Sequence, residues 1–320
     1  MATIIRGLLK GYHYMNTEIA DPRVQDWFLM GSPWPGLALL TFYLYFVQSL
    51  GPRLMKDRKP FNLDRLMQIY NIVQIILSGY LLYKALVLAW LWDYSLYCEP
   101  VDYSDDPKAV EVSFLHRWQT SPDKIMQILR VPMKQRTLFT LQIAGTVWIY
   151  FIVKVIDLLD TVFFVLRKKS NQISFLHVYH HTGMVIGSWA GVKYLPGGHG
   201  TFLGLVNSFV HVVMYGHYFA TSMKISRPWW KKYITQLQLI QFVLILVHFS
   251  QLAWIEDCGF PRWPALIFVP QNLFMIVLFG DFYYKTYVRK SKGKAVATNG
   301  VSNGIAKATS NGKPAAPKTD

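Results

Sequence analysis

Long runs of apolar residues, separated by short polar segments, dominate this sequence. They do not alternate with polar positions as the strands and surface helices of a soluble domain do. The runs cover residues 34–50, 69–92, 137–166, 175–195, 200–222, 233–254 and 264–287. Most reach the ~20 residues that an α-helix needs to cross a ~30 Å hydrocarbon core. The pattern predicts an all-α fold, a polytopic membrane bundle of seven transmembrane helices.

The composition agrees with this prediction. Of the 320 residues, 52% are hydrophobic and only 16% are charged, whereas soluble domains carry about a quarter charged residues. The many aromatic residues argue against a disordered chain, and two cysteines are too few for a disulfide scaffold. One run fits a bilayer poorly: residues 137–166 are too long, so we expect one end of that helix to leave the core.

The positions of the basic residues predict an orientation. The chain has 33 Lys and Arg against 18 Asp and Glu, a formal charge of +15. Basic clusters occur at residues 53–65, 167–169, 224–232 and 285–294, all on one side of the predicted spans. The positive-inside rule puts that side in the cytoplasm and the amino terminus outside. The charge therefore indicates topology, and we do not expect nucleic acid as a partner.

This topology divides the chain into three parts. Residues 1–26 form a non-cytoplasmic segment, residues 27–290 the seven-helix domain, and residues 291–320 a disordered cytoplasmic tail. Cys98 and Cys258 both fall in non-cytoplasmic loops, on the face that is oxidising in the secretory pathway. We predict a disulfide between them; the alternative is two unpaired thiols.

Polar and ionisable side chains occur inside the apolar runs at helical spacing. Such groups are costly in a bilayer and indicate function. The set comprises Lys154, Asp157, Asp160, His177, His180, His181, Asn207, His211, Tyr215, Gln238 and Gln241. At ~1.5 Å rise per residue, Asp160, His180, Gln238 and Gln241 lie roughly 10 Å from the cytoplasmic surface and His211 somewhat deeper, so we expect one site in that half of the bundle. Single members can instead merely bond a neighbouring helix, and Lys154, Asp157 and Asp160 can form a buried ion pair.

Three histidines within five residues, in the arrangement HxxHH, form the most informative cluster. At ~100° per residue, His177, His180 and His181 occupy one arc of roughly 100° and can face a common cavity. HxxHH boxes bind iron in membrane desaturases, but no second box occurs among the nine histidines. A single metal on His177, His181 and His211 stays open. The alternative is metal-free chemistry, because burial favours the neutral imidazole, which is a base or a nucleophile.

Four motifs in this order resemble those of the very-long-chain fatty acid elongases, the ELO family of 3-ketoacyl-CoA synthases. They read Lys154-Val-Ile-Asp157-Leu-Leu-Asp160-Thr161, His177-Val-Tyr-His180-His181, His211-Val-Val-Met214-Tyr215 and Thr235-Gln-Leu-Gln238-Leu-Ile-Gln241. The resemblance runs from about Trp27 to Tyr287. Two positions depart from it: the family often has Glu in place of Asp157 and Tyr in place of His217. A carboxyl-terminal dilysine retrieval signal is also absent from this sequence.

The resemblance implies an enzyme of the endoplasmic reticulum membrane whose helices enclose an acyl tunnel. Such an enzyme condenses a long-chain acyl-CoA with malonyl-CoA to a 3-ketoacyl-CoA, CO2 and CoA, without a cofactor or a metal. A ketoacyl-CoA reductase and a dehydratase would act downstream, and no GxGxxG nucleotide loop occurs in this chain.

The same resemblance implies roles for the residues of the site. His180 would form an acyl-imidazole, His211 would orient or deprotonate, and His177 with His181 would stabilise developing charge. Asn207, Gln238 and Gln241 would donate to an oxyanion, and Lys154 with the basic loops would receive the CoA phosphates. Asp157, Asp160 and Tyr215 complete the predicted substrate site.

A seven-helix transporter or receptor is the rival interpretation. Receptor signatures such as Asp-Arg-Tyr or Asn-Pro-x-x-Tyr are missing, and the last run reads Phe279-Gly-Asp281-Phe-Tyr-Tyr284. A transport path should be polar over its whole depth. Here the polar groups stop near mid-membrane, which favours a tunnel closed at its far end.

Overall fold

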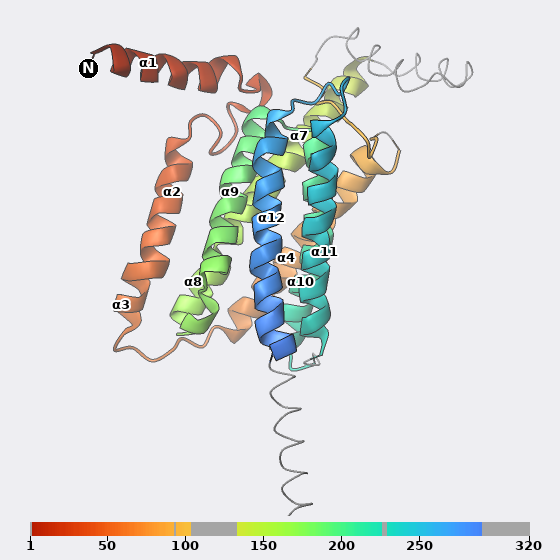
Figure 1. Ribbon diagram of the computed structural model, residues 1–320. Helices are drawn as coiled ribbons and strands as arrows, with labels where there is room; N and C mark the ends of the chain where they lie inside the picture. Colours follow the sequence, from red (N-terminus) through yellow and green to blue (C-terminus); the bar gives the residue numbers. More distant parts are fainter. Residues whose placement is uncertain (1, 93, 104–132, 226–228, 290–320) are drawn as a thin grey trace, which may run out of the picture.

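The computed structural model describes residues 2–92, 94–103, 133–225 and 229–289, and every regular element in these ranges is helical. The longer helices lie side by side in a bundle, and α1 crosses one end of it (Figure 1). The helices are α1 (Ala2–His13), α2 (Trp34–Tyr45), α3 (Gly51–Met55), α4 (Asp64–Ala85), α7 (Met133–Ile156), α8 (Leu159–Leu166), α9 (Phe175–Tyr194), α10 (Thr201–Ser222), α11 (Trp230–Ser250) and α12 (Trp263–Tyr283). The all-α prediction is confirmed.

Three stretches are long and apolar enough to cross a membrane by themselves: Asp64–Trp90, Trp230–Ala253 and Trp263–Arg289. The outer surface of the bundle agrees with a lipid environment. Leu266 is 79% exposed and Val277 66%, whereas Gln74 is 0% and Lys154 3% exposed. Apolar residues outside and polar residues inside are the reverse of what water selects. The chain is therefore a membrane protein whose interior holds the polar side chains.

The overlong run at 137–166 is divided by a break between α7 and α8. Helix α7 ends at Ile156 and α8 begins at Leu159. Beside the break, the Leu158 N–H bonds the Val155 carbonyl at 3.3 Å, a tighter turn than that of an α-helix. Residues 157 and 158 thus leave the regular helix, and α8 packs against α3.

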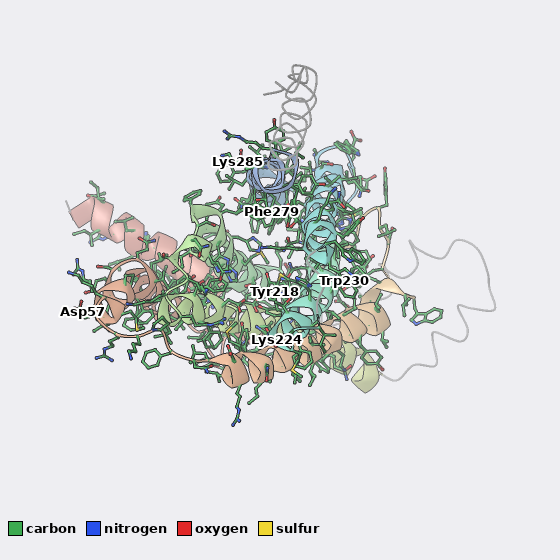
Figure 2. The ribbon with its side chains drawn as sticks, turned by 90° about the horizontal axis from the view of Figure 1, so that it is seen from below. Asp57, Tyr218, Lys224, Trp230, Phe279 and Lys285 are labelled. Atoms are coloured by element: carbon green, nitrogen blue, oxygen red, sulfur yellow. A yellow bond between two sulfur atoms is a disulfide. The ribbon has the colours of Figure 1, made fainter. Side chains whose placement is uncertain are left out.

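The described parts of the four basic segments lie at one end of the bundle, as the topology predicts. The ends of α3, α8, α10 and α12 and the start of α11 meet at the bottom of Figure 1. Figure 2 looks at this end, with Asp57, Lys224, Trp230 and Lys285 labelled on the segments that reach it. Residues 291–320, the predicted tail, lie outside the described residues.

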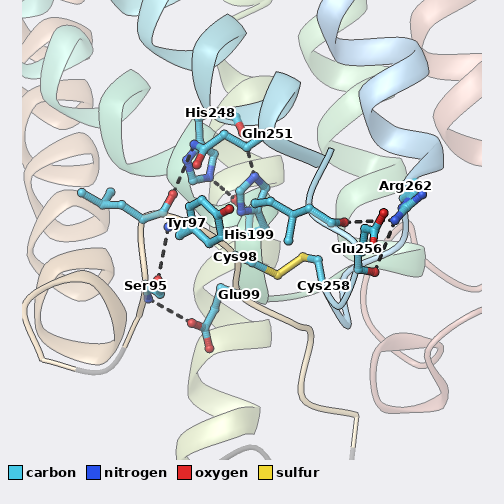
Figure 3. The surroundings of a disulfide bond; sticks show 12 residues. Ser95, Tyr97, Cys98, Glu99, His199, His248, Gln251, Glu256, Cys258 and Arg262 are labelled. Carbon is cyan, nitrogen blue, oxygen red and sulfur yellow. Dashed lines mark hydrogen bonds between the residues drawn. A yellow bond between two sulfur atoms is a disulfide. The ribbon is translucent and has the colours of Figure 1, made fainter. Parts of the chain in front are cut away.

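The opposite end of the bundle carries the disulfide. Cys98 is bonded to Cys258, with their Cα atoms 5.8 Å apart (Figure 3), which confirms the predicted pairing. Beside it, the rings of His199 and His248 stack at 3.6 Å between centroids. Each ring nitrogen Nε2 bonds the other residue's backbone carbonyl, at 3.0 and 3.1 Å. These bonds fix the loop before α10 to the end of α11.

Gly198 is required in the same loop. Its φ is +59°, and a Cβ there would meet the Pro100 carbonyl oxygen at 2.6 Å. Only glycine permits both that backbone conformation and such a close approach. The segment that carries Cys98 is thereby packed directly on the start of α10.

We expect removal of the disulfide to destabilise the protein without removing a buried contact of the site. The covalent loop spans 160 residues, for which chain entropy gives at most about 5 kcal/mol. The variant with both Cys98→Ser and Cys258→Ser should unfold at a lower temperature than wild type in detergent. Non-reducing digestion and mass spectrometry of wild type should give the linked peptide. An unchanged unfolding midpoint, or two free thiols in wild type, would contradict this account.

Candidate active site

The histidine box occupies the first two turns of α9. Ser174 caps this helix, because its hydroxyl accepts from the His177 N–H at 3.2 Å. The side chains of the box then diverge. His177 Nε2 lies 3.0 Å from Thr161 Oγ1 on α8, and the His181 ring packs on His177 at 4.3 Å between centroids. Thus His177 and His181 share the α8 side of the helix.

His180 points to the other side of α9, into a cavity of about 530 Å³. Its ring has Phe242 of α11 at 6.1 Å and Phe279 of α12 at 6.3 Å between centroids. The expectation that all three imidazoles face one cavity is therefore wrong for His177 and His181. The reason is the spacing: residues i and i+4 lie about 40° apart on a helix, whereas i+3 lies about 60° to the opposite side.

The cavity continues from His180 along the bundle toward the end that carries the disulfide. Asn207 and Gln241 line it, and so do Leu195, Phe249 and Phe260 toward the disulfide end. Its wall is mainly apolar, with His180 and a few other polar side chains among the lining residues. This is the usual composition of a binding site for an apolar molecule that carries one polar group.

His211 of α10 lies beside a buried ion pair. Lys154 Nζ is 3.0 Å from Asp157 Oδ2 and 3.4 Å from His211 Nδ1. The same Asp157 oxygen is 3.7 Å from His211 Nδ1. His211 is also close enough to His180 and His181 to interact electrostatically. The structure thus brings His211 together with both the ion pair and the histidine box.

Asp157 accepts bonds from three helices. Besides Lys154, its Oδ1 accepts from Gln74 Nε2 of α4 at 2.5 Å and lies 3.1 Å from the Tyr215 hydroxyl of α10. The Tyr215 hydroxyl is also 2.7 Å from Asp160 Oδ2. Lys154 is only 3% exposed. This arrangement favours the buried ion pair over the predicted contact between Lys154 and CoA phosphates.

The amides of the predicted site separate in the structure. Asn207 accepts from the Tyr150 hydroxyl at 2.9 Å and donates to Gln241 Oε1 at 3.4 Å. Both amides line the cavity, whereas Gln238 does not: its Nε2 lies 3.5 Å from Met214 Sδ. Residues three apart on α11 differ by about 60° in direction, so only Gln241 faces the cavity. Gln238 thus differs from Asn207 and Gln241 in its surroundings, and its role as an oxyanion donor stays a prediction.

Sequence analysis missed the polar residues of α4. Tyr70 and Gln74 are buried, and the Gln74 amide bonds both Asp157 and the Tyr70 hydroxyl, the latter at 2.9 Å. A signal was available, because Tyr70, Gln74 and Ser78 recur every four residues and so form one stripe. The apolar residues between them conceal this stripe in a count of hydrophobic positions.

The histidines do not assemble into a recognisable metal site. Within the described residues, no three His, Cys, Asp or Glu side chains converge closely enough to hold a metal ion. The set of His177, His181 and His211 is therefore not gathered as metal ligands, because His177 is bonded to Thr161 and His211 faces Lys154.

Comparison with known proteins identifies the family. The model of the ELO family, described as the GNS1/SUR4 family, matches residues 28–295. The chain is 39% identical to very long chain fatty acid elongase 7 of Drosophila melanogaster, over 94% of this chain and 84% of that protein. It is 39% identical to human very long chain fatty acid elongase 1, over 91% of this chain and 95% of that protein. The chain belongs to the ELO family of fatty acid elongases, as its motifs predicted.

The buried pair at the site generates a stability prediction. Lys154→Met alone leaves Asp157 as a buried unpaired charge, and we expect a loss of about 3–5 kcal/mol. The double variant Lys154→Met with Asp157→Leu removes both charges and should lose less than Lys154→Met alone. Thermal unfolding in detergent of wild type, Lys154→Met, Asp157→Leu and the double variant gives the coupling as a double-mutant cycle.

The exposed pair of Lys285 and Asp281, 2.8 Å apart, is the matched control. Lys285→Met should cost no more than about 1 kcal/mol, since water screens the remaining carboxylate. A Lys154→Met variant as stable as Lys285→Met would show that the buried charges do not depend on each other.

Proposed function

We propose that this protein condenses a long-chain acyl-CoA with malonyl-CoA to give a 3-ketoacyl-CoA, CoA and CO2. The observation that carries the proposal is the position of His180, the one imidazole of its box that lines the apolar cavity. An acyl tail can occupy that cavity while its thioester carbon lies against the His180 ring. The cavity volume of about 530 Å³ falls within the roughly 300–1,000 Å³ of small-molecule sites.

In the first half-reaction, a ring nitrogen of His180 attacks the thioester carbon. The new C–N bond replaces the C–S bond, and CoA leaves as a thiolate that takes up the imidazole proton. The product is an acyl-imidazole in the cavity. Asn207 and Gln241 line the same cavity, and their side-chain amides would stabilise the oxyanion of the addition step.

In the second half-reaction, malonyl-CoA loses CO2, and the electron pair of the broken C–C bond stays on the α-carbon as an enolate. This carbon attacks the acyl carbon, the C–N bond breaks, and His180 regains a proton. His211 is suited to hold or orient that proton, because Lys154 and Asp157 fix its Nδ1 side. His177 and His181 support the box from the α8 side.

The proposal includes an endoplasmic reticulum membrane protein with seven spans and a cytoplasmic carboxyl terminus. The described parts of the four basic segments lie at one end of the bundle, which supports this orientation. CoA phosphates would then bind at this cationic end, and the tail would lie toward the disulfide. A ketoacyl-CoA reductase and a dehydratase would take up the product.

We expect His180→Ala to abolish incorporation of labelled malonyl-CoA into lipid product, because no imidazole of the box then lines the cavity. The purified variant should elute from size exclusion like wild type. Normal turnover by this variant would exclude His180 as the nucleophile.

The matched control is His217→Tyr, which substitutes the residue that the family often has outside the box. This variant should keep wild-type turnover. Incubation of wild type with acyl-CoA alone should also give a protein mass increased by one acyl group, and His180→Ala should give none. A retained adduct in His180→Ala would place the acyl group elsewhere.

The proposed chemistry needs no metal ion. Incubation of the purified enzyme with a strong chelator, followed by removal of the chelator, should leave the rate of malonyl-CoA incorporation unchanged. A reproducible loss of activity that iron or zinc restores would instead support a metal held by the histidines.

A further inference from the structure

Helix α1 has one apolar face and one basic face. At ~100° per residue, its large apolar side chains fall within an arc of about 140°. They are Ile4, Ile5, Leu8, Leu9 and Tyr12. The opposite arc holds Arg6, Lys10 and His13, and the helix has no acidic residue.

The apolar face of α1 is not covered by the described part of the chain. Leu8 is 69% exposed, Ile4 68% and Leu9 64%. In water such a row of aliphatic side chains is unfavourable, since full burial of one is worth about 1.5–3 kcal/mol. The helix therefore requires an apolar partner that the bundle does not provide.

The position of α1 relative to the bundle identifies the partner. The helix lies crosswise to α2 at the end of the bundle that carries the disulfide, and it reaches the top of α9 (Figure 1). If these helices cross a bilayer, α1 lies parallel to its surface, at the depth where the spans emerge.

Aromatic contacts agree with this depth. The Tyr12 ring stacks on Trp34, the first residue of α2, at 6.1 Å between centroids, and Trp34 is 62% exposed. Trp and Tyr side chains are enriched at the boundary between lipid tails and headgroups. Because Tyr12 belongs to the apolar arc, this contact also turns that arc toward α2, which is the side of the spans.

We propose that α1 binds the surface of the bilayer that the bundle spans, with its aliphatic row in the outer part of the hydrocarbon. Arg6 and Lys10 then face the phosphate groups of phospholipids, whose negative charge they complement. A second copy of this chain would also offer an apolar surface. However, it would not explain why α1 lies at the depth of the aromatic residues and carries only basic charges.

Site-directed spin labelling tests this proposal on the full chain. Its only two cysteines form a disulfide, so a single introduced cysteine is the sole free thiol. Leu8→Cys and the matched Arg6→Cys are labelled with a nitroxide in nanodiscs of phosphatidylcholine and phosphatidylglycerol. Power saturation then compares collision with oxygen, which concentrates in lipid, and with a water-soluble nickel complex.

We expect the ratio of oxygen to nickel accessibility to be high at position 8 and inverted at position 6. High nickel accessibility at both positions would place α1 in water and overturn the proposal. Low accessibility to both reagents at position 8 would indicate a protein partner, and would also overturn it. Both labels are measured in the assembled protein, so the result does not depend on whether α1 folds as a free peptide.

A second variant tests the apolar face itself. In the background Leu8→Glu with Leu9→Glu, a label at Ile5→Cys should lose its excess of oxygen accessibility, whereas Thr3→Glu should leave it unchanged. Condensing activity in the same samples shows that the bundle is folded. If the label at position 5 keeps its excess of oxygen accessibility when both glutamates are present, the aliphatic row does not hold α1 in lipid.

Discussion

The structure depends on one constraint: charged and hydrogen-bonding side chains must be hidden from an apolar solvent. Asp157 illustrates it. A carboxylate in the interior of such a bundle is tolerated only with several donors around it, and here the donors come from α4, α7 and α10. The ion pair with Lys154 therefore joins three helices at one point. His211 contacts this pair, and these contacts hold its ring in position.

The helix break beside Asp157 has a chemical consequence. It separates α8 from the axis of α7, and Thr161 of α8 then meets His177 at 3.0 Å. This contact occupies one imidazole of the box on the far side from the cavity. The three imidazoles of the box are therefore not equivalent. His177 and His181 pack and bond within the bundle, and of the three only His180 lines the cavity. A single, rigidly held imidazole at the cavity is what the proposed covalent mechanism requires.

Sequence patterns predicted the helical class, the shared end of the basic loops, the disulfide and the family. These features follow from quantities that are local in sequence, such as run length, charge position and ordered motifs. The directions of His177, Gln238 and Lys154 did not follow, because they depend on which neighbouring helix each side chain meets. The spacing of Tyr70 and Gln74 indicated one polar stripe on α4. Its role as a hydrogen-bonding partner of the buried ion pair depends on the position of Asp157, which the spacing does not give. Helix α1 was missed because a search for spans ignores short amphipathic segments.

The disulfide also constrains how the chain is made. Cys98 precedes Cys258 by 160 residues, and α7, α8, α9, α10 and α11 lie between them. At about 5–20 residues per second, a ribosome needs on the order of ten to thirty seconds to deliver the second thiol after the first. During that interval Cys98 has no partner thiol in this chain. Covalent closure is thus a late event of biosynthesis, which follows the synthesis of α7 to α11.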